Sequence, residues 1–258
     1  MNRTLRILLP LVTTLAVTDP ALAFDRGLWA EQLARHTRAV EDTAGTRVEY
    51  AALRRDPDWR RLVAGLDASE PPAPAARAET LAFWIDVYNV LAIDWIVREG
   101  PVASIRDLGS WLRPVWKRPA GRVGGREVSL DEIEHHILRP LGEPRIHFAI
   151  VCASTSCPSL QREPFRAADL DRQLDARART FLADPRKGLA LERAAGRARV
   201  SKILDWFAAD FGGRDGVVAF VAAHAPPDSA AWLSQHTGDV ELAWFDYDWR
   251  VNAIPGRE

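Results

Sequence analysis

Both cysteines of the chain lie in one short segment, residues 145–160, together with one of its six histidines. An apolar run over 146–151 leads to Cys152, and Cys157 follows before a proline. A cysteine near a histidine has the residue types of a thiolate nucleophile and its base, while two cysteines can instead form a disulfide. Any chemistry in this chain is therefore expected to begin in this segment.

The N-terminus indicates the compartment in which these cysteines act. Two arginines precede an apolar stretch at 7–17, and the small residues at 21–23 fit a cleavage site, so residues 1–23 are predicted to be a secretory signal peptide. The stretch is too short and too interrupted for an integral membrane span. We expect a periplasmic or secreted protein. In that setting the spacing first favours a local disulfide between Cys152 and Cys157.

Composition limits the partners. The chain has 34 basic and 35 acidic residues, so it offers no electrostatic footprint for nucleic acid. Zinc would need two ligands beyond the cysteines, and only scattered histidines are available, so no metal or other cofactor is expected. The expected partner is an unknown small molecule or peptide. Ten tryptophans indicate a core or a groove built from indoles, with most of them in the core.

A second group of candidates lies on a helix predicted to begin at Ser129, whose spacing to Glu132 fits a capping box. Glu134 falls on the apolar stripe of this helix, and His135 borders the stripe. A carboxyl that points into the core must be paired or have a raised pKa, as a general acid or base requires. The pattern leaves open whether Glu134 is catalytic or a buried structural acid.

A central helix is predicted over 79–98, where apolar residues occupy nearly the whole helical wheel. Asp86 and Asn89 lie three residues apart and so share a face of this helix, which places polar groups inside the protein. Such groups must be hydrogen-bonded. Two interpretations of Asn89 remain: it ties the helix to a neighbouring loop, or it lines a site.

The apolar run over 146–151 is predicted to be a strand. Because side chains alternate on a strand, His147 and Cys152 would point to opposite faces, about 16 Å apart along the chain. A direct dyad of these two residues is therefore not expected. A pairing of His135 with Cys152, or of His147 with Cys157, stays open.

The remaining pattern favours a single domain over 24–252 with an N-terminal helical arm at 24–70. A hairpin is expected over 188–201 and a last strand over 240–245. The predicted fold is α+β, mostly helical, with the central helix packed on a small and largely antiparallel sheet that includes 146–151 and the last strand.

Four separated motifs occur in the chain at 82–89, 129–135, 145–158 and 247–249. Their order and spacing resemble the domain of unknown function 547 family over residues 75–252. The resemblance implies that no activity is assigned. This family usually has asparagine where Asp86 stands, which puts a site role there in doubt, whereas Asn89 matches. Some eukaryotic relatives carry glutaredoxin-like modules, which implies a possible link to thiol chemistry.

Three functions follow as hypotheses. The favoured one is a non-catalytic binding or structural domain of the cell envelope with an oxidised cysteine pair. The second is a cysteine-dependent hydrolase or acyl transferase, in a layout similar to transglutaminase-like and papain-like enzymes but without a cysteine on the central helix. The third is a thiol redox role. The candidate catalytic residues of the enzyme hypothesis are the nucleophile Cys152 or Cys157, the base His135 or His147, and the orienting groups Glu134 and Asn89.

Overall fold

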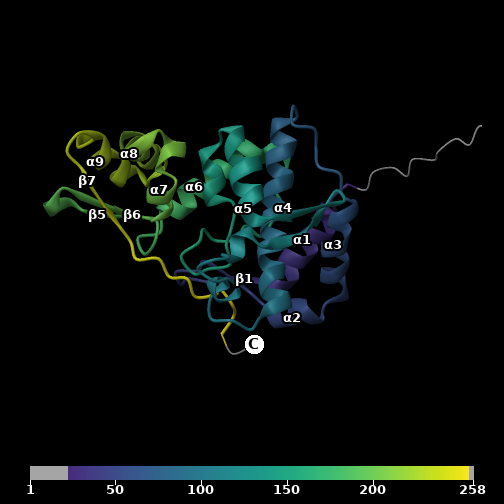
Figure 1. The fold of residues 1–258 in the computed structure, drawn as a ribbon. Helices are drawn as coiled ribbons and strands as arrows, with labels where there is room; N and C mark the ends of the chain where they lie inside the picture. Colours follow the sequence, from purple (N-terminus) through teal and green to yellow (C-terminus); the bar gives the residue numbers. More distant parts are fainter. Residues whose placement is uncertain (1–22, 256–258) are drawn as a thin grey trace, which may run out of the picture.

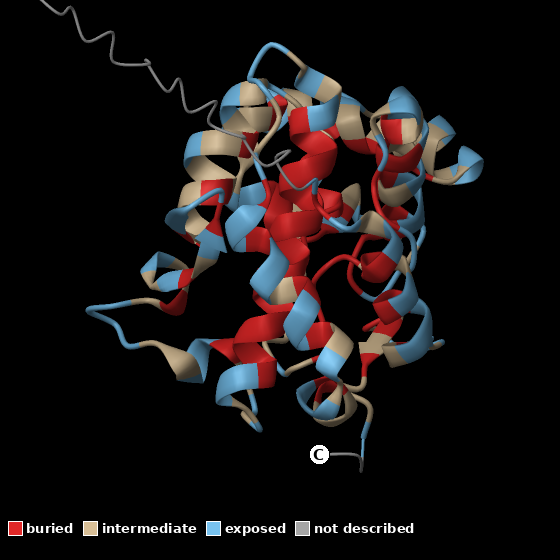
Figure 2. Cartoon of the chain, turned by 90° about the vertical axis from the view of Figure 1, so that its right-hand side faces the viewer, coloured by how far each residue is buried: buried red, intermediate tan, exposed pale blue. Residues whose placement is uncertain are grey.

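A long apolar helix, α4 (Arg77–Glu99), runs through the middle of the structure, a computed structural model that describes residues 23–255 (Figure 1). All of its residues from Thr80 to Val97 are buried, and Figure 2 shows buried residues concentrated in the central helices. The predicted central helix is confirmed. Within the described residues α4 is the one helix long and apolar enough to cross a membrane, and it is enclosed by protein. The predicted signal peptide falls outside the described residues except for its last position.

The N-terminal arm packs along α4. Two indoles attach it: Trp29 Nε1 donates a hydrogen bond to Asp86 at 3.1 Å, and Trp59 Nε1 donates to Asp94 at 3.0 Å. Buried carboxylates need such donors, and the arm adds one to each of these two groups on α4. The elements of the arm are α1 (Arg26–His36), β1 (Thr37–Ala39), β2 (Thr46–Val48), α2 (Tyr50–Arg55) and α3 (Pro57–Ala68).

The segment after the hairpin β3 (Pro119–Val123) and β4 (Arg126–Ser129) is helical with changing geometry. The Ser129 hydroxyl accepts a hydrogen bond from the Glu132 amide at 3.0 Å and starts α5 (Leu130–Glu132), which confirms the predicted helix start. The chain then widens into π-helical turns over Ile133–Leu138. Such turns often accompany functional sites, because they change which side chains share a face.

The predicted strand over 146–151 is wrong. The chain forms a 3₁₀ helix, Pro144–Phe148, followed by a non-helical stretch. Proline fixes a helical φ at the start of this element and lacks an amide for a strand ladder. In place of a neighbouring strand, Asn89 takes the backbone hydrogen bonds of the stretch: its amide donates to the Ala149 carbonyl at 3.0 Å, and its oxygen accepts from the Val151 amide at 2.8 Å.

The C-terminal half builds a second hydrophobic cluster around a three-stranded sheet. The hairpin predicted over 188–201 is confirmed as the antiparallel pair β5–β6, and the last strand is confirmed as β7. β7 pairs with β6 in parallel, so this sheet is mixed rather than purely antiparallel, within an α+β fold. The elements are α6 (Leu170–Leu182), β5 (Leu189–Glu192), β6 (Arg197–Val200), α7 (Ile203–Trp206), α8 (Gly213–His224), α9 (Pro227–Gln235) and β7 (Glu241–Trp244).

The C-terminal tail returns from this sheet across the body of the protein, as the yellow trace in Figure 1 shows. Its backbone carbonyls at Asp248 and Arg250 accept hydrogen bonds from the amides of Ser156 and Thr155, at 3.1 and 2.8 Å. The tail therefore lies directly against the loop that holds the two cysteines.

Candidate functional site

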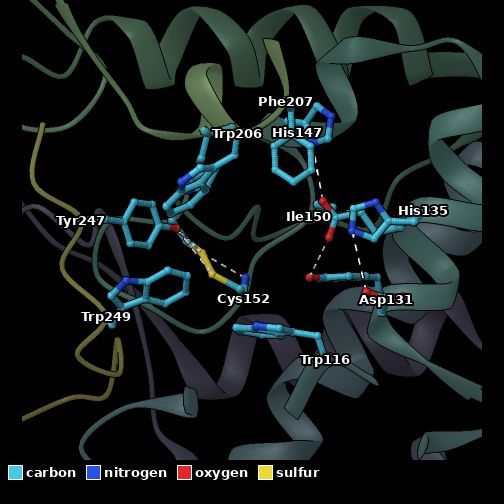
Figure 3. Close-up of a pocket in the computed structure, with 15 residues that line it drawn as sticks. Trp116, Asp131, His135, His147, Ile150, Cys152, Trp206, Phe207, Tyr247 and Trp249 are labelled. Carbon is cyan, nitrogen blue, oxygen red and sulfur yellow. Dashed lines mark hydrogen bonds and ion pairs between the residues drawn. A yellow bond between two sulfur atoms is a disulfide. The ribbon is translucent and has the colours of Figure 1, made fainter. Parts of the chain in front are cut away.

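A cavity of about 340 Å³ opens where the α4 cluster, the cysteine loop and the C-terminal tail meet (Figure 3). Its lining comes from distant parts of the chain and is rich in aromatic rings and titratable groups. The lining residues are Tyr88, Trp116, Asp131, Glu134, His135, His147, Ile150, Cys152, Cys157, Pro158, Ile203, Trp206, Phe207, Tyr247 and Trp249.

One wall of the pocket is aromatic. The rings of Trp206 and Trp249 stack with centroids 5.7 Å apart, and Tyr247 lies 4.5 Å from Trp249. Trp116 continues the wall at 6.1 Å from Trp249. Trp206 is 46% exposed, which is unusual for so large an apolar side chain beside a cavity. The indoles therefore present ring faces to whatever enters.

The opposite side holds a chain of ionisable groups around His147. Its Nε2 lies 2.8 Å from Asp210, and Arg139 makes a two-pronged ion pair with the same carboxylate at 2.7 Å. The paired guanidinium keeps the pKa of Asp210 below its usual range. Burial lowers the pKa of His147 to about 4, so the imidazole is neutral at pH 7 and its one proton is assigned to Nε2, facing Asp210.

Glu134 faces the free side of that imidazole. Its carboxyl oxygen lies 3.7 Å from His147 Nδ1, and Tyr88 donates a long hydrogen bond of 3.5 Å to it. Burial raises the pKa of Glu134 to about 7, although Arg139 and Tyr88 oppose the shift. The prediction that this side chain points inward is confirmed. At neutral pH the carboxyl is partly protonated, which suits it to both donate and accept protons.

His135 belongs to the same group of residues but lies nearer its edge. Its Nδ1 lies 2.7 Å from the Arg139 guanidinium and accepts from it, and its Nε2 is 3.9 Å from Asp131. Burial lowers the pKa of His135 as well. The structure thus brings three of the candidate residues, His135, His147 and Glu134, to one pocket.

Cys152 and Cys157 form a disulfide at the base of the aromatic wall, which confirms the pairing favoured by their spacing. Their partners are hydroxyls and a backbone amide: Ser154, Tyr247 and the Cys152 amide all contact the sulfur atoms. Within residues 23–255 no histidine nitrogen is among these partners, and no cluster of three His, Cys, Asp or Glu side chains is placed to hold a metal ion.

Asn89 and Asp86 serve the scaffold. Asn89 holds the stretch that precedes Cys152 and is absent from the pocket lining, in agreement with the interpretation that it ties α4 to a loop. Asp86 accepts hydrogen bonds from Trp29 and from the Phe165 amide at 3.1 Å, on the far side of the helix from the pocket.

Sequence reasoning missed several residues of the site, above all Asp210, Arg139, Tyr247 and the wall tryptophans. Asp210 lies 63 positions from His147, so no local pattern joins them. The tail motif at 247–249 offered a signal, because Tyr-Asp-Trp places two aromatic rings on one side of an extended chain.

Residues 72–182 match the family model described as "Protein of unknown function, DUF547". The resemblance inferred from the motifs is confirmed over this range, which contains Tyr88, Glu134, His147 and the disulfide. Asp210 and the tail motif lie outside it. No curated protein matches the chain, and no solved structure does.

Proposed function

We propose that the chain is an exported binding domain that holds a small ligand in the aromatic pocket without changing that ligand chemically. The pocket itself carries this proposal, because it combines an open cavity, indole walls and hydrogen-bonding groups on one side. Contiguous apolar surface of this kind on a folded protein is often a binding site. Concave, mostly apolar sites with a few directed polar groups are the usual form of small-molecule sites.

The lining indicates the chemistry of the ligand. The rings of Trp116, Trp206 and Trp249 can stack on a flat ring face. Across the cavity, Glu134 and Tyr88 can hydrogen-bond to hydroxyl or amide groups on the same ligand. A ring that carries polar substituents on one side, as in a saccharide unit or a cyclic fragment of an envelope peptide, fits both requirements.

Export is part of the proposal. The pattern in residues 1–23 fits a signal peptide, and a disulfide persists in an oxidising compartment. Cell-envelope glycans and peptides are then the ligands within reach.

The hydrolase hypothesis gains less support. In the oxidised pair neither sulfur is a free thiolate, and the hydrogen-bond partners of the sulfurs include no base. His147 is occupied with Asp210 and Glu134 instead.

The test is a titration of the oxidised protein with a panel of saccharides and cyclic amides, in which tryptophan fluorescence monitors binding. We expect saturable quenching by at least one class, and an affinity at least tenfold weaker in Trp249→Ala, because the ligand loses its stacking face. The matched control is Trp111→Ala, since Trp111 is 88% exposed and outside the pocket lining. An unchanged affinity in Trp249→Ala, or an equal loss in Trp111→Ala, would refute binding in this pocket.

A further inference from the structure

The two sulfur atoms of the disulfide have different surroundings. Cys157 is 3% exposed, whereas Cys152 is partly exposed, and both border the aromatic pocket. Figure 3 shows the bond at the foot of the Tyr247, Trp206 and Trp249 wall. A thiol that entered the pocket would therefore meet Cys152 as the more accessible sulfur.

Three hydrogen-bond donors converge on the buried sulfur. The Cys152 amide lies 3.0 Å from Cys157 Sγ, and the hydroxyls of Ser154 and Tyr247 each lie 3.2 Å from it. The same hydroxyls lie farther from Cys152 Sγ, at 3.3 and 3.5 Å, so the amide is the contact that most distinguishes Cys157. A disulfide sulfur is a weak acceptor and gains little from such contacts, while a thiolate is a strong one. The arrangement is therefore better matched to a negative charge on Cys157 than to the neutral bond.

Thiol–disulfide exchange places a negative charge on one of the two sulfur atoms of the disulfide. An attacking thiolate bonds to one sulfur, and the other leaves as a thiolate; the leaving group departs faster when its pKa is lower. Cys152 has the accessibility of the attacked sulfur, and Cys157 has the donors that stabilise a leaving thiolate.

We propose that the Cys152–Cys157 bond is a reversible, reactive disulfide that oxidises a dithiol reaching the pocket, with Cys152 as the attacked sulfur and Cys157 as the leaving group. This activity goes beyond ligand binding and uses the same pocket, including Glu134 and Tyr247.

The steps balance with a dithiol as the reductant. Its first thiol loses a proton, the resulting thiolate bonds to Cys152 Sγ, and the electron pair of the disulfide goes to Cys157 Sγ. The second substrate thiol, after losing its proton, attacks the substrate sulfur of the mixed disulfide and releases Cys152 as a thiolate. The dithiol becomes a disulfide and the protein takes up two electrons. A disulfide oxidant of the compartment returns the protein to its starting state.

Glu134 is a suitable acceptor for the first proton. It lines the same cavity, and its pKa of about 7 lets it take a proton at neutral pH and release it later. Tyr88 donates a hydrogen bond to Glu134, and the charge of Arg139 favours its ionised form.

The first test isolates Cys157. In Cys152→Ser, the rate of iodoacetamide alkylation is followed against pH. We expect a thiol pKa at least one unit below the ordinary value of about 8.5, and a return toward that value when Tyr247→Phe or Ser154→Ala is added. Tyr50→Phe is the matched control, because its hydroxyl bonds Asn252 at 2.6 Å and contacts no sulfur. A Cys157 pKa at or above 8.5 would overturn the proposal.

The second test uses the intact chain with both cysteines. We expect the disulfide to equilibrate with a millimolar glutathione buffer while the protein stays folded by circular dichroism, and to exchange about tenfold more slowly in Tyr247→Phe. A bond that stays oxidised, or an exchange rate unchanged in both Tyr247→Phe and Ser154→Ala, would refute the assignment. Exchange with glutathione does not require a ring ligand. A failure of exchange therefore leaves the binding result intact, and a failure of binding leaves the exchange result intact.

Discussion

Two carboxyl groups of this protein, Asp86 and Glu134, share a pKa near 7 for one reason, burial, but have different surroundings. Asp86 is 1% exposed and accepts hydrogen bonds from the Trp29 indole and the Phe165 amide. Glu134 borders a cavity and faces an imidazole. Asp86 is a structural acid whose ionisation destabilises the fold, whereas Glu134 can exchange protons with a bound molecule.

Replacement of Asp86 by asparagine should make the stability less dependent on pH. A raised carboxyl pKa means that the folded state binds more protons than the unfolded state between about pH 4 and pH 7, so stability falls as pH rises through that window. Asparagine keeps an acceptor for Trp29 and carries no charge. We expect the free energy of unfolding of Asp86→Asn, taken relative to that of the wild type, to increase from pH 4 to pH 8 by up to about 4 kcal/mol.

Urea unfolding at pH 4, 6 and 8 measures this difference. The control is Asp215→Asn, because that side chain is 93% exposed. If the free energies of unfolding of the wild type and Asp86→Asn differ by the same amount at all three pH values, the assignment of a raised pKa to Asp86 is wrong.

At the scale of elements, the cysteine loop is held from several sides. The Lys187 ammonium donates to the Cys157 carbonyl at 2.6 Å and to the Ala44 carbonyl at 3.3 Å. Burial lowers the pKa of Lys187 to about 8. The tail holds the loop from the opposite side through the backbone of Thr155 and Ser156. These contacts do not depend on the sulfur–sulfur bond.

Reduction of the disulfide should therefore weaken the fold without abolishing it. The cysteines are five positions apart, and closing so short a loop restricts the unfolded chain by about 2 kcal/mol. We expect the free energy of unfolding in urea to fall by that amount when a phosphine reductant is added. Complete unfolding on reduction would contradict this estimate and the reversibility of the bond as well.

An element could be predicted from the sequence when neighbouring residues determine it. The apolar wheel of α4, the Ser129 cap and the hairpin β5–β6 are set by neighbouring residues, and all three are confirmed. The apolar run over 146–151 has the length of a strand, yet its backbone partner is the Asn89 side chain from another element, which no local pattern reveals. Glu134 was found because a carboxylate interrupts an apolar stripe, whereas Asp210 is only near in space.

At the scale of the whole molecule, the N-terminal arm and the C-terminal tail are hydrogen-bonded to each other. Val48 of the arm exchanges backbone hydrogen bonds with Asn252 and Ile254 of the tail at 3.0 and 3.1 Å, and the Tyr50 hydroxyl donates to the Asn252 side chain at 2.6 Å. Both partners lie outside the range that matches the family model. The matched segment is thus a part of the folded unit.

Deletion of residues 24–68 should prevent stable folding, because it removes the partners of Asp86, Asp94 and Asn252 together with the apolar cover of α4. We expect rapid digestion by a protease and a loss of near-ultraviolet circular dichroism. A chain that starts at residue 24 is the control and should resist the protease. A resistant, folded product of the deletion would show that the arm is dispensable.

The position of Tyr247, 90 residues after Cys157, has a consequence for how the protein is made. During synthesis the cysteine loop emerges long before the tail, and a bond between residues five apart needs no distant segment to form. The last residues supply the phenol and the Trp249 ring, so the sulfur bond can form before the pocket is complete.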